Sequence, residues 1–191
     1  VLFDRVHESI KCDKIIIDDV GGAVKATNHL IELGCEKIAL LTTEDFVTVG
    51  CLRKDGYKKA LTQANIPINQ DLIYKISDDI SLYEQIKRVI FVTNPPDGIV
   101  AVNEIYAATA MKIAQERGLK IPEDIKIIGF TSGLISEFTS PPLSAVVQHG
   151  FTMGKQAAAL LINRIEQKEP TEFQKEVISP NLKIRESTQK R

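Results

Sequence analysis

Two short apolar runs constrain the fold of this chain more than any other feature. Residues 98–102 (GIVAV) are apolar at every position, and residues 125–129 (IKIIG) are nearly so. Runs of this length between turn-forming residues are typical of buried strands, which need cover on both faces. Segments with helical periodicity separate these strands from other strand-like runs. Such an alternation predicts an α/β fold with parallel sheets joined by right-handed crossovers.

The expected elements follow from periodicity and from the residues that end helices. A carboxylate of Asp18 or Asp19 can cap a helix that stops at Gly34. The expected helices are this segment and residues 51–64, 82–91, 104–117 and 153–167. The expected strands are residues 1–3, 14–17, 37–41, 72–76, 98–102, 125–129, 143–147, 176–178 and 182–184.

Charge and cysteine content limit the cellular compartment and the classes of partner that suit this chain. The 191 residues carry 24 basic and 25 acidic side chains, a net charge of −1, which argues against broad electrostatic binding to nucleic acid or anionic lipid. No apolar run is long enough to cross a bilayer, and the first residues do not resemble a signal peptide. The three cysteines cannot all pair with one another. We therefore expect a cytoplasmic protein with no membrane partner.

Motifs for cofactors, metals and catalysis are weak in this sequence. It contains neither GxGxxG nor a P-loop, and its histidines and cysteines lack metal-site spacing, so we expect no cofactor and no metal. Residues 129–133 (GFTSG) resemble a nucleophile elbow with Thr131 at the nucleophile position, but no long helix follows. We therefore expect no enzyme. An α/β hydrolase stays open as an alternative if Thr131, His149 and an acid converge.

Sheet topology indicates where a ligand would bind. In open parallel sheets, ligands bind beyond the carboxyl ends of the strands. The segments that follow Leu41, Val102 and Phe130 are therefore the places where we expect polar groups to line a site.

The order and spacing of several short motifs resemble the lactose-repressor/galactose-repressor (LacI/GalR) family, and together they cover almost the whole chain. These motifs are DDVGGA (18–23), HLIELG (29–34), KIALL (37–41), RKDGY (53–57), PDGIVAVNE (96–104), IPEDI (121–125), IGF (128–130), PPLSAV (141–146) and RES (185–187).

The resemblance implies a two-lobed effector module like that of periplasmic sugar-binding proteins. Residues 1–14 and 149–178 would form part of an N-terminal lobe, and residues 15–148 would form the C-terminal lobe. Residues 179–191 would be a terminal strand and tail. The DNA-binding headpiece and most of the first pass through the N-terminal lobe would lie outside this chain. Three segments would cross between the lobes, with the effector in the cleft between them.

The resemblance and the strand-end positions identify six candidate ligand-binding residues. They are Arg53, Asn103, Glu104, Thr131, Asp4 and Gln148. Arg53 matches the position where the family places an arginine on the effector, and a guanidinium offers a rigid fork of donors. The alternative for Arg53 is a pairing with Asp55 or another neighbour on its helix. We expect Arg53→Ala to weaken effector binding while leaving the fold intact.

Two of the other candidates depart from the family pattern. Glu104 follows Asn103 where the family commonly has an aspartate, and Thr131 replaces a common aspartate.

Asp4 and Gln148 are weaker candidates at the lobe crossings. Val47 and Val49 occupy a loop that is often polar in sugar-binding relatives, which favours an effector with an apolar part or no small effector.

The function implied is the effector-binding and dimerisation module of a bacterial transcription regulator. A sugar or sugar derivative would close the lobes and alter a homodimer that holds two headpieces on operator DNA. Two alternatives besides the hydrolase remain open. The chain could be the solute-binding protein of a transporter or sensor, or it could answer to a protein partner instead of a sugar.

Overall fold

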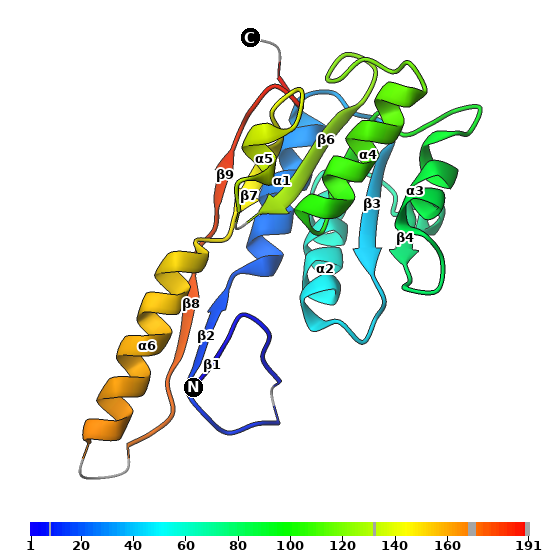
Figure 1. The fold of residues 1–191 in the computed structure, drawn as a ribbon. Helices are drawn as coiled ribbons and strands as arrows, with labels where there is room; N and C mark the ends of the chain where they lie inside the picture. The colour runs from blue at the N-terminus through cyan, green and yellow to red at the C-terminus, as the bar shows by residue number, and fades with distance from the viewer. Residues whose placement is uncertain (8, 132, 168–170, 190–191) are drawn as a thin grey trace.

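The strands of the chain form two separate sheets (Figure 1). The computed structural model describes residues 1–7, 9–131, 133–167 and 171–189. The larger sheet contains, in spatial order, β4 (Ile73–Ile76), β3 (Ile38–Thr43), β5 (Gly98–Ala101), β6 (Lys126–Thr131), β7 (Ser144–Val147) and β9 (Asn181–Lys183). The smaller sheet contains β1 (Leu2–Phe3), β2 (Lys14–Ile17) and β8 (Lys175–Ile178). Among the described residues every strand pair is parallel except β7 with β9, which confirms the predicted α/β class.

The expected helices are present with differences at a few ends, and one short helix, α5 (Ile135–Phe138), is additional. The helices are α1 (Asp19–Glu32), α2 (Thr48–Gln63), α3 (Leu82–Ile90), α4 (Glu104–Glu116), α5 (Ile135–Phe138) and α6 (Gly150–Glu166), with a 3-10 turn η1 (Gln70–Leu72). Helix α2 starts before the expected Cys51. Its N-cap residue is Val47, which makes no side-chain capping bond, so the sequence carries no capping residue that would predict this start. The single turn of α5 is too short to show periodicity. No helix in the described part of the chain is both long and apolar enough to cross a membrane.

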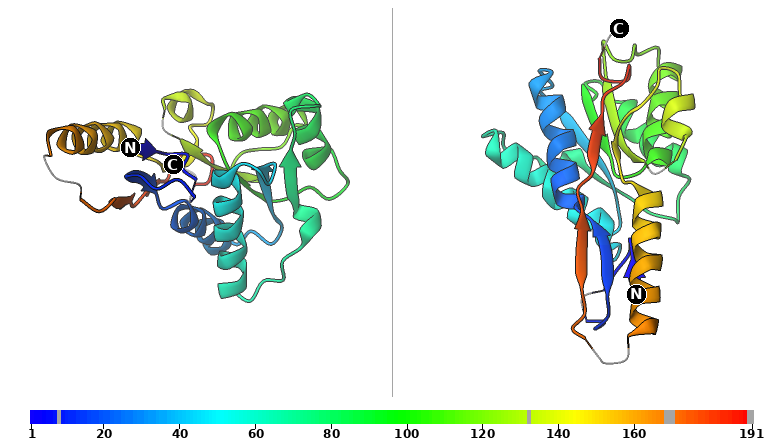
Figure 2. Two further views of the ribbon diagram at one scale, coloured as in Figure 1. Left: turned by 90° about the horizontal axis from the view of Figure 1, so that it is seen from below. Right: turned by 90° about the vertical axis from the view of Figure 1, so that its left-hand side faces the viewer.

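Strand β5 is covered on both faces, as its apolar sequence predicts. Ile99 and Ala101 belong to one hydrophobic core, with residues of α3 and α4. Val100 and Val102 belong to a second core on the opposite face, with residues of α1 and α2 (Figure 2). The larger sheet is therefore the middle layer of three, and its strand ends are the polar edge where a site can form.

The smaller sheet extends away from the larger one together with α6 (Figure 1). Ile15 and Ile17 of β2 pack against Met153 and Leu160 of α6. All of β2 pairs with β8, so the predicted boundary at residue 15 cuts through one strand of the smaller sheet. The boundary that follows the sheets lies after Ile17. The segment 179–191, predicted as a terminal strand and tail, contributes β9 to the larger sheet, and residues 190–191 lie outside the described residues.

Three short connections join the two sheets. Asp18 separates β2 from α1, residues 148–149 separate β7 from α6, and residues 179–180 separate β8 from β9. The first and third lie side by side, because the Asp18 N–H donates to the Ile178 carbonyl at 2.9 Å. Lys25 Nζ donates to the Pro180 carbonyl at 2.8 Å and ties α1 to the third connection.

Helices α1 and α2 approach each other at the level of their backbones. A Cβ atom at Gly56 would lie 2.3 Å from the Val20 carbonyl oxygen and 2.7 Å from the Ala23 Cβ. Only glycine fits at this contact. Arg53 lies about one turn before Gly56 on α2, and Asp19 directly precedes Val20 on α1. The contact at Gly56 therefore brings Arg53 within reach of Asp19.

We expect Gly56→Ala to lower the free energy of unfolding by about 3 kcal/mol, because the added methyl group overpacks a rigid backbone contact. Gly154 in α6 is the matched control, since a Cβ there would meet no atom within 4 Å. Gly154→Ala should raise the free energy of unfolding by about 0.5–1 kcal/mol. Urea denaturation measures both changes, and equal effects of the two substitutions would contradict the close helix contact.

Candidate functional site

A cavity of about 180 Å³ lies at the carboxyl ends of the central strands. Its lining includes Asp4, Thr43, Arg53, Val102, Asn103 and Gln148. These residues come from the loop after β1, the end of β3, helix α2, the segment between β5 and α4, and the connection after β7. The cavity thus combines four of the six predicted ligand-binding residues with the predicted edge of the sheet.

Arg53 forms a buried ion pair with Asp19, and both side chains are 4% exposed. Its Nε donates to Asp19 Oδ1 at 2.7 Å, and its Nη1 donates to the Val102 carbonyl. The guanidinium carbon lies 4.0 Å from the centre of the Phe130 ring, a cation–π geometry. The partner of Arg53 is therefore an aspartate on α1, and not Asp55 or another neighbour on α2.

Burial acts on both members of this pair. It raises the pKa of the Asp19 carboxyl and lowers the pKa of the Arg53 guanidinium, and in each case the partner's charge opposes the shift. Removing one partner would leave the other charge buried and uncompensated. We therefore expect Arg53→Ala to destabilise the fold, in contrast to the expectation from sequence that it would leave the fold intact.

Two buried donors on the cavity wall lack a hydrogen bond within the described residues. Arg53 Nη2 lies 2.6 Å from Asp19 Oδ1 as an ion pair, but it makes no hydrogen bond of acceptable geometry. Thr43 Oγ1 also has no partner. Buried polar atoms in native proteins are almost always satisfied by protein, water or ligand. These two donors belong to residues that line the cavity, and each has unused hydrogen-bonding capacity.

The other predicted residues on this wall have partial structural roles. The Asn103 side chain caps α4 by accepting the Tyr106 N–H at 2.8 Å. Asp4 has a φ of 61°, in the left-handed region that aspartate tolerates better than most residues, and its N–H donates to the Ile15 carbonyl at 3.0 Å. The Gln148 N–H donates to the Thr131 carbonyl at 3.0 Å. Val47 and Val49 also line the cavity and give it an apolar side.

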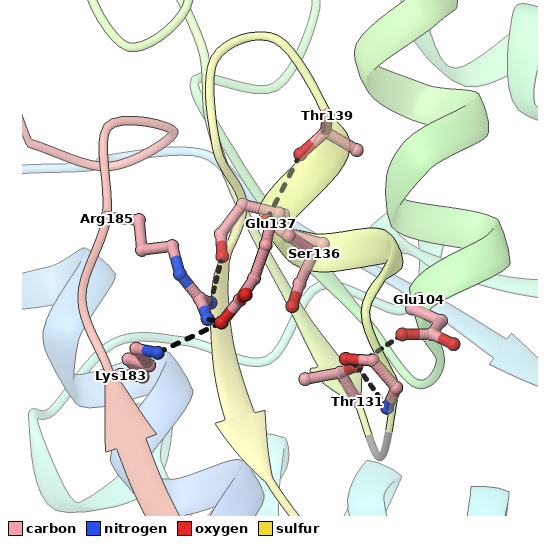
Figure 3. A network of polar contacts seen from close by, with 9 residues as sticks. Glu104, Thr131, Ser136, Glu137, Thr139, Lys183 and Arg185 are labelled. Atoms are coloured by element: carbon pink, nitrogen blue, oxygen red, sulfur yellow. Dashed lines mark hydrogen bonds and ion pairs between the residues drawn. The ribbon is translucent and has the colours of Figure 1, made fainter.

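Glu104 and Thr131 are brought together, but not at this cavity. The Thr131 hydroxyl donates to the Glu104 carboxylate and accepts the Gly133 N–H at 3.1 Å (Figure 3). Neither residue lines the cavity at Arg53. Among the described residues, Thr131 has no hydrogen bond to His149, and Ser132 of the predicted elbow lies outside them. Within the described residues, the pairing of Thr131 with His149 that the hydrolase alternative requires is therefore absent.

A larger cavity of about 620 Å³ adjoins the first and shares Arg5, Thr43, Val47 and Asn103 with it. Glu44, Asp78 and Asp79 also line it. The candidate site therefore continues from Arg53 towards the end of β4 and becomes more acidic. Across the described residues, no group of three or more His, Cys, Asp or Glu side chains is placed to hold a metal ion.

Sequence reasoning missed three residues that shape the site. Asp19 was expected to be a possible helix cap, but Asp18 takes that role by accepting the Gly21 N–H at 2.8 Å and leaves Asp19 to pair with Arg53. Phe130 lies under the guanidinium. Thr43 ends β3, and the rule that ligands bind at strand ends points to that segment without selecting the residue.

Comparison with known proteins identifies a matching family model and several related transcription regulators. Residues 27–188 match the family model described as a periplasmic binding protein-like domain. The HTH-type transcriptional regulator DegA of Bacillus subtilis (strain 168) is 33% identical over 178 residues, which are 92% of this chain and 52% of that protein. The HTH-type transcriptional repressor PurR of Histophilus somni (strain 129Pt) is 34% identical over 176 residues, covering 92% and 53%. The chain spans about half the length of these curated relatives.

A solved structure agrees with this relationship. The crystal structure of a LacI family transcriptional regulator from Enterococcus faecium with bound ribose superposes with a TM-score of 0.88 and 28% sequence identity, covering 97% of this chain and 69% of that one. The predicted resemblance is confirmed by sequence and by fold. The chain belongs to the periplasmic binding protein-like domain family, in the form that occurs in transcription regulators of the lactose-repressor/galactose-repressor type.

Proposed function

We propose that this chain is the effector-binding and dimerisation module of a bacterial transcription regulator, and that the cavity at Arg53 binds a sugar or sugar derivative. The regulator would be a cytoplasmic homodimer that holds operator DNA through a headpiece outside this chain. The smaller sheet with α6 would belong to the N-terminal lobe and the larger sheet to the C-terminal lobe. The matched relatives are transcriptional regulators, and this supports a regulatory role over catalysis or solute transport.

The observation that carries the proposal is the pair of unsatisfied donors on one cavity wall. Arg53 Nη2 and Thr43 Oγ1 are buried, lack hydrogen-bond partners among the described residues, and belong to residues that line the same cavity. A ligand hydroxyl can accept a hydrogen bond from each and thereby satisfy both. The two donors match a molecule that carries several oxygens.

The rest of the lining also suits a sugar. The carboxylate of Asp4 can accept hydrogen bonds from ligand hydroxyls, while Val47 and Val49 can contact the C–H face of a ring. The adjoining cavity provides space for a further ring or substituent. Asn103 and Gln148 would complete the polar lining, and Glu104 with Thr131 would support the site from outside the cavity.

The mechanism would be a population shift between open and closed arrangements of the two lobes. Asp4 and Gln148 lie near the connections between the sheets, and Arg53 and Thr43 lie at the edge of the larger sheet. A ligand that contacts both regions binds the closed arrangement more tightly and increases its population. Closure would change the geometry of the homodimer and so the spacing of two headpieces on DNA.

Replacement of Thr43 tests the ligand role without disturbing the fold. We expect Thr43→Val to change the free energy of unfolding by less than about 1 kcal/mol, because within the described part of the chain the hydroxyl has no partner to lose. The affinity for the effector should fall about tenfold, since one hydrogen bond to the ligand is lost. A thermal-shift panel of pentoses, hexoses and disaccharides, beginning with ribose, identifies the sugar, and calorimetric titration then measures the affinity.

The matched control is Thr62→Val, which lies on the exposed side of α2 outside the cavity. It should leave the affinity unchanged. A panel in which no sugar raises the Tm would contradict the sugar class. An unchanged affinity of Thr43→Val for the identified effector would contradict the proposed site.

Replacement of Arg53 is expected to act on stability as well as binding. Arg53→Ala should lower the free energy of unfolding by about 3–5 kcal/mol, because Asp19 is left buried without its counter-charge. Urea denaturation at neutral pH measures the loss. The variant Arg53→Ala/Asp19→Asn should recover part of it, because the uncompensated charge is removed. A double variant that is no more stable than Arg53→Ala alone would show that the ion pair is not the cause.

A further inference from the structure

A separate cavity of about 440 Å³, here called the second cavity because it lies apart from the two adjoining ones at Arg53, is found between α5 and β9, on the side of the larger sheet where β7 and β9 pair. Its lining includes Thr131, Ser136, Glu137, His149, Lys183 and Arg185. It shares no lining residue with the cavity at Arg53. Of its lining, the sugar-binding role proposed above uses only Thr131, as a support from outside the cavity at Arg53.

Ser136 contributes an unpartnered hydroxyl to this second cavity. The residue is 1% exposed, and its Oγ has no hydrogen-bond partner within the described residues. Its backbone is satisfied, because its carbonyl oxygen accepts the Leu143 N–H at 2.8 Å. In Figure 3 the hydroxyl lies between the Glu137 carboxylate and Thr131, both of which line the cavity. The Ser136 hydroxyl therefore has unused hydrogen-bonding capacity.

The charges around the cavity are unequal. Lys183 Nζ and Arg185 Nη2 each lie 3.1 Å from the same oxygen of Glu137, Oε1 (Figure 3). Two cations thus share one carboxylate. The Arg185 side chain is only 11% exposed while that of Glu137 is 47% exposed, so solvent weakens the compensation that Glu137 provides. Two cations and one carboxylate line the cavity, and Glu104, bonded to Thr131, is a further acidic group beside it, so a bound anion would share Lys183 and Arg185 with Glu137.

The size and apolar part of the lining indicate an organic ligand. Val147 and Leu182 line the cavity beside the charged groups. A volume of about 440 Å³ falls within the range of pockets that enclose small molecules. A ligand that carries one charged oxygen group on a small apolar body would contact both parts of the lining.

We propose that this cavity is a second ligand site, which binds a small organic oxyanion through the Ser136 hydroxyl and the side chains of Lys183 and Arg185. The carboxylate or phosphate group of the ligand accepts from Ser136 Oγ and shares the two cations with Glu137. The apolar body of the ligand lies against Val147 and Leu182.

Three aromatic probes test the proposal by calorimetric titration of the full-length protein. Benzoate carries a carboxylate, phenyl phosphate carries a phosphate, and benzyl alcohol carries a similar ring without charge. We expect at least one of the two anions to bind in the millimolar range and benzyl alcohol to give no binding heat. The anion that binds more tightly identifies whether the site selects carboxylates or phosphates.

Four variants assign the binding to this cavity. Ser136→Ala and Lys183→Gln should each weaken anion binding about tenfold, and Lys183→Arg should retain it. Lys112→Gln is the matched control, because Lys112 is 69% exposed on α4 and does not line the cavity. Ser136→Ala should leave the Tm unchanged or raise it, since its hydroxyl has no partner to lose among the described residues.

The proposal is overturned if neither anion binds, or if benzyl alcohol binds as tightly as the anions. It is also overturned if Ser136→Ala and Lys183→Gln bind the anions with unchanged affinity, because the probes would then bind elsewhere. The sugar site is judged separately by Thr43→Val, which should leave anion binding unaffected.

Discussion

The buried ion pair between Arg53 and Asp19 is the interaction on which the organisation of the candidate site depends. It joins α1 to α2, and the same guanidinium reaches the Val102 carbonyl after β5 and the Phe130 ring of β6. A single side chain therefore connects two helices and two strands at the polar edge of the sheet. Because an unpaired charge in this position would destabilise the fold by several kcal/mol, the pairing holds Arg53 in one orientation towards the cavity.

Much of the fold could be predicted because strand burial leaves a clear pattern in the sequence. Residues 98–102 are apolar throughout, and the structure covers both faces of β5 with separate cores. The exceptions are features that depend on distant contacts. The single turn of α5 has no period to detect. The assignment of β2 to the smaller sheet depends on its pairing with β8, which lies far away in the sequence.

The candidate site was less predictable than the fold. Family resemblance identified Arg53, and strand ends identified Asn103, but no pattern distinguishes the capping role of Asp18 from the pairing role of Asp19. Thr43 and Ser136 illustrate a further limit. Each is an ordinary small polar residue in the sequence, and only the surrounding burial reveals that its hydroxyl has no partner among the described residues.

The three connections between the sheets have a mechanical consequence. A lobe that is joined to another by a single chain connection can rotate in any direction. Several neighbouring connections resist torsion between the two lobes and leave mainly hinge bending. Asp18, residues 148–149 and residues 179–180 provide these points, and a hydrogen bond from Asp18 to Ile178 couples two of them. We therefore expect the smaller sheet and α6 to move relative to the larger sheet mainly by bending towards its strand ends. The residues of the two lobes that face each other would then meet in the same register each time the lobes close.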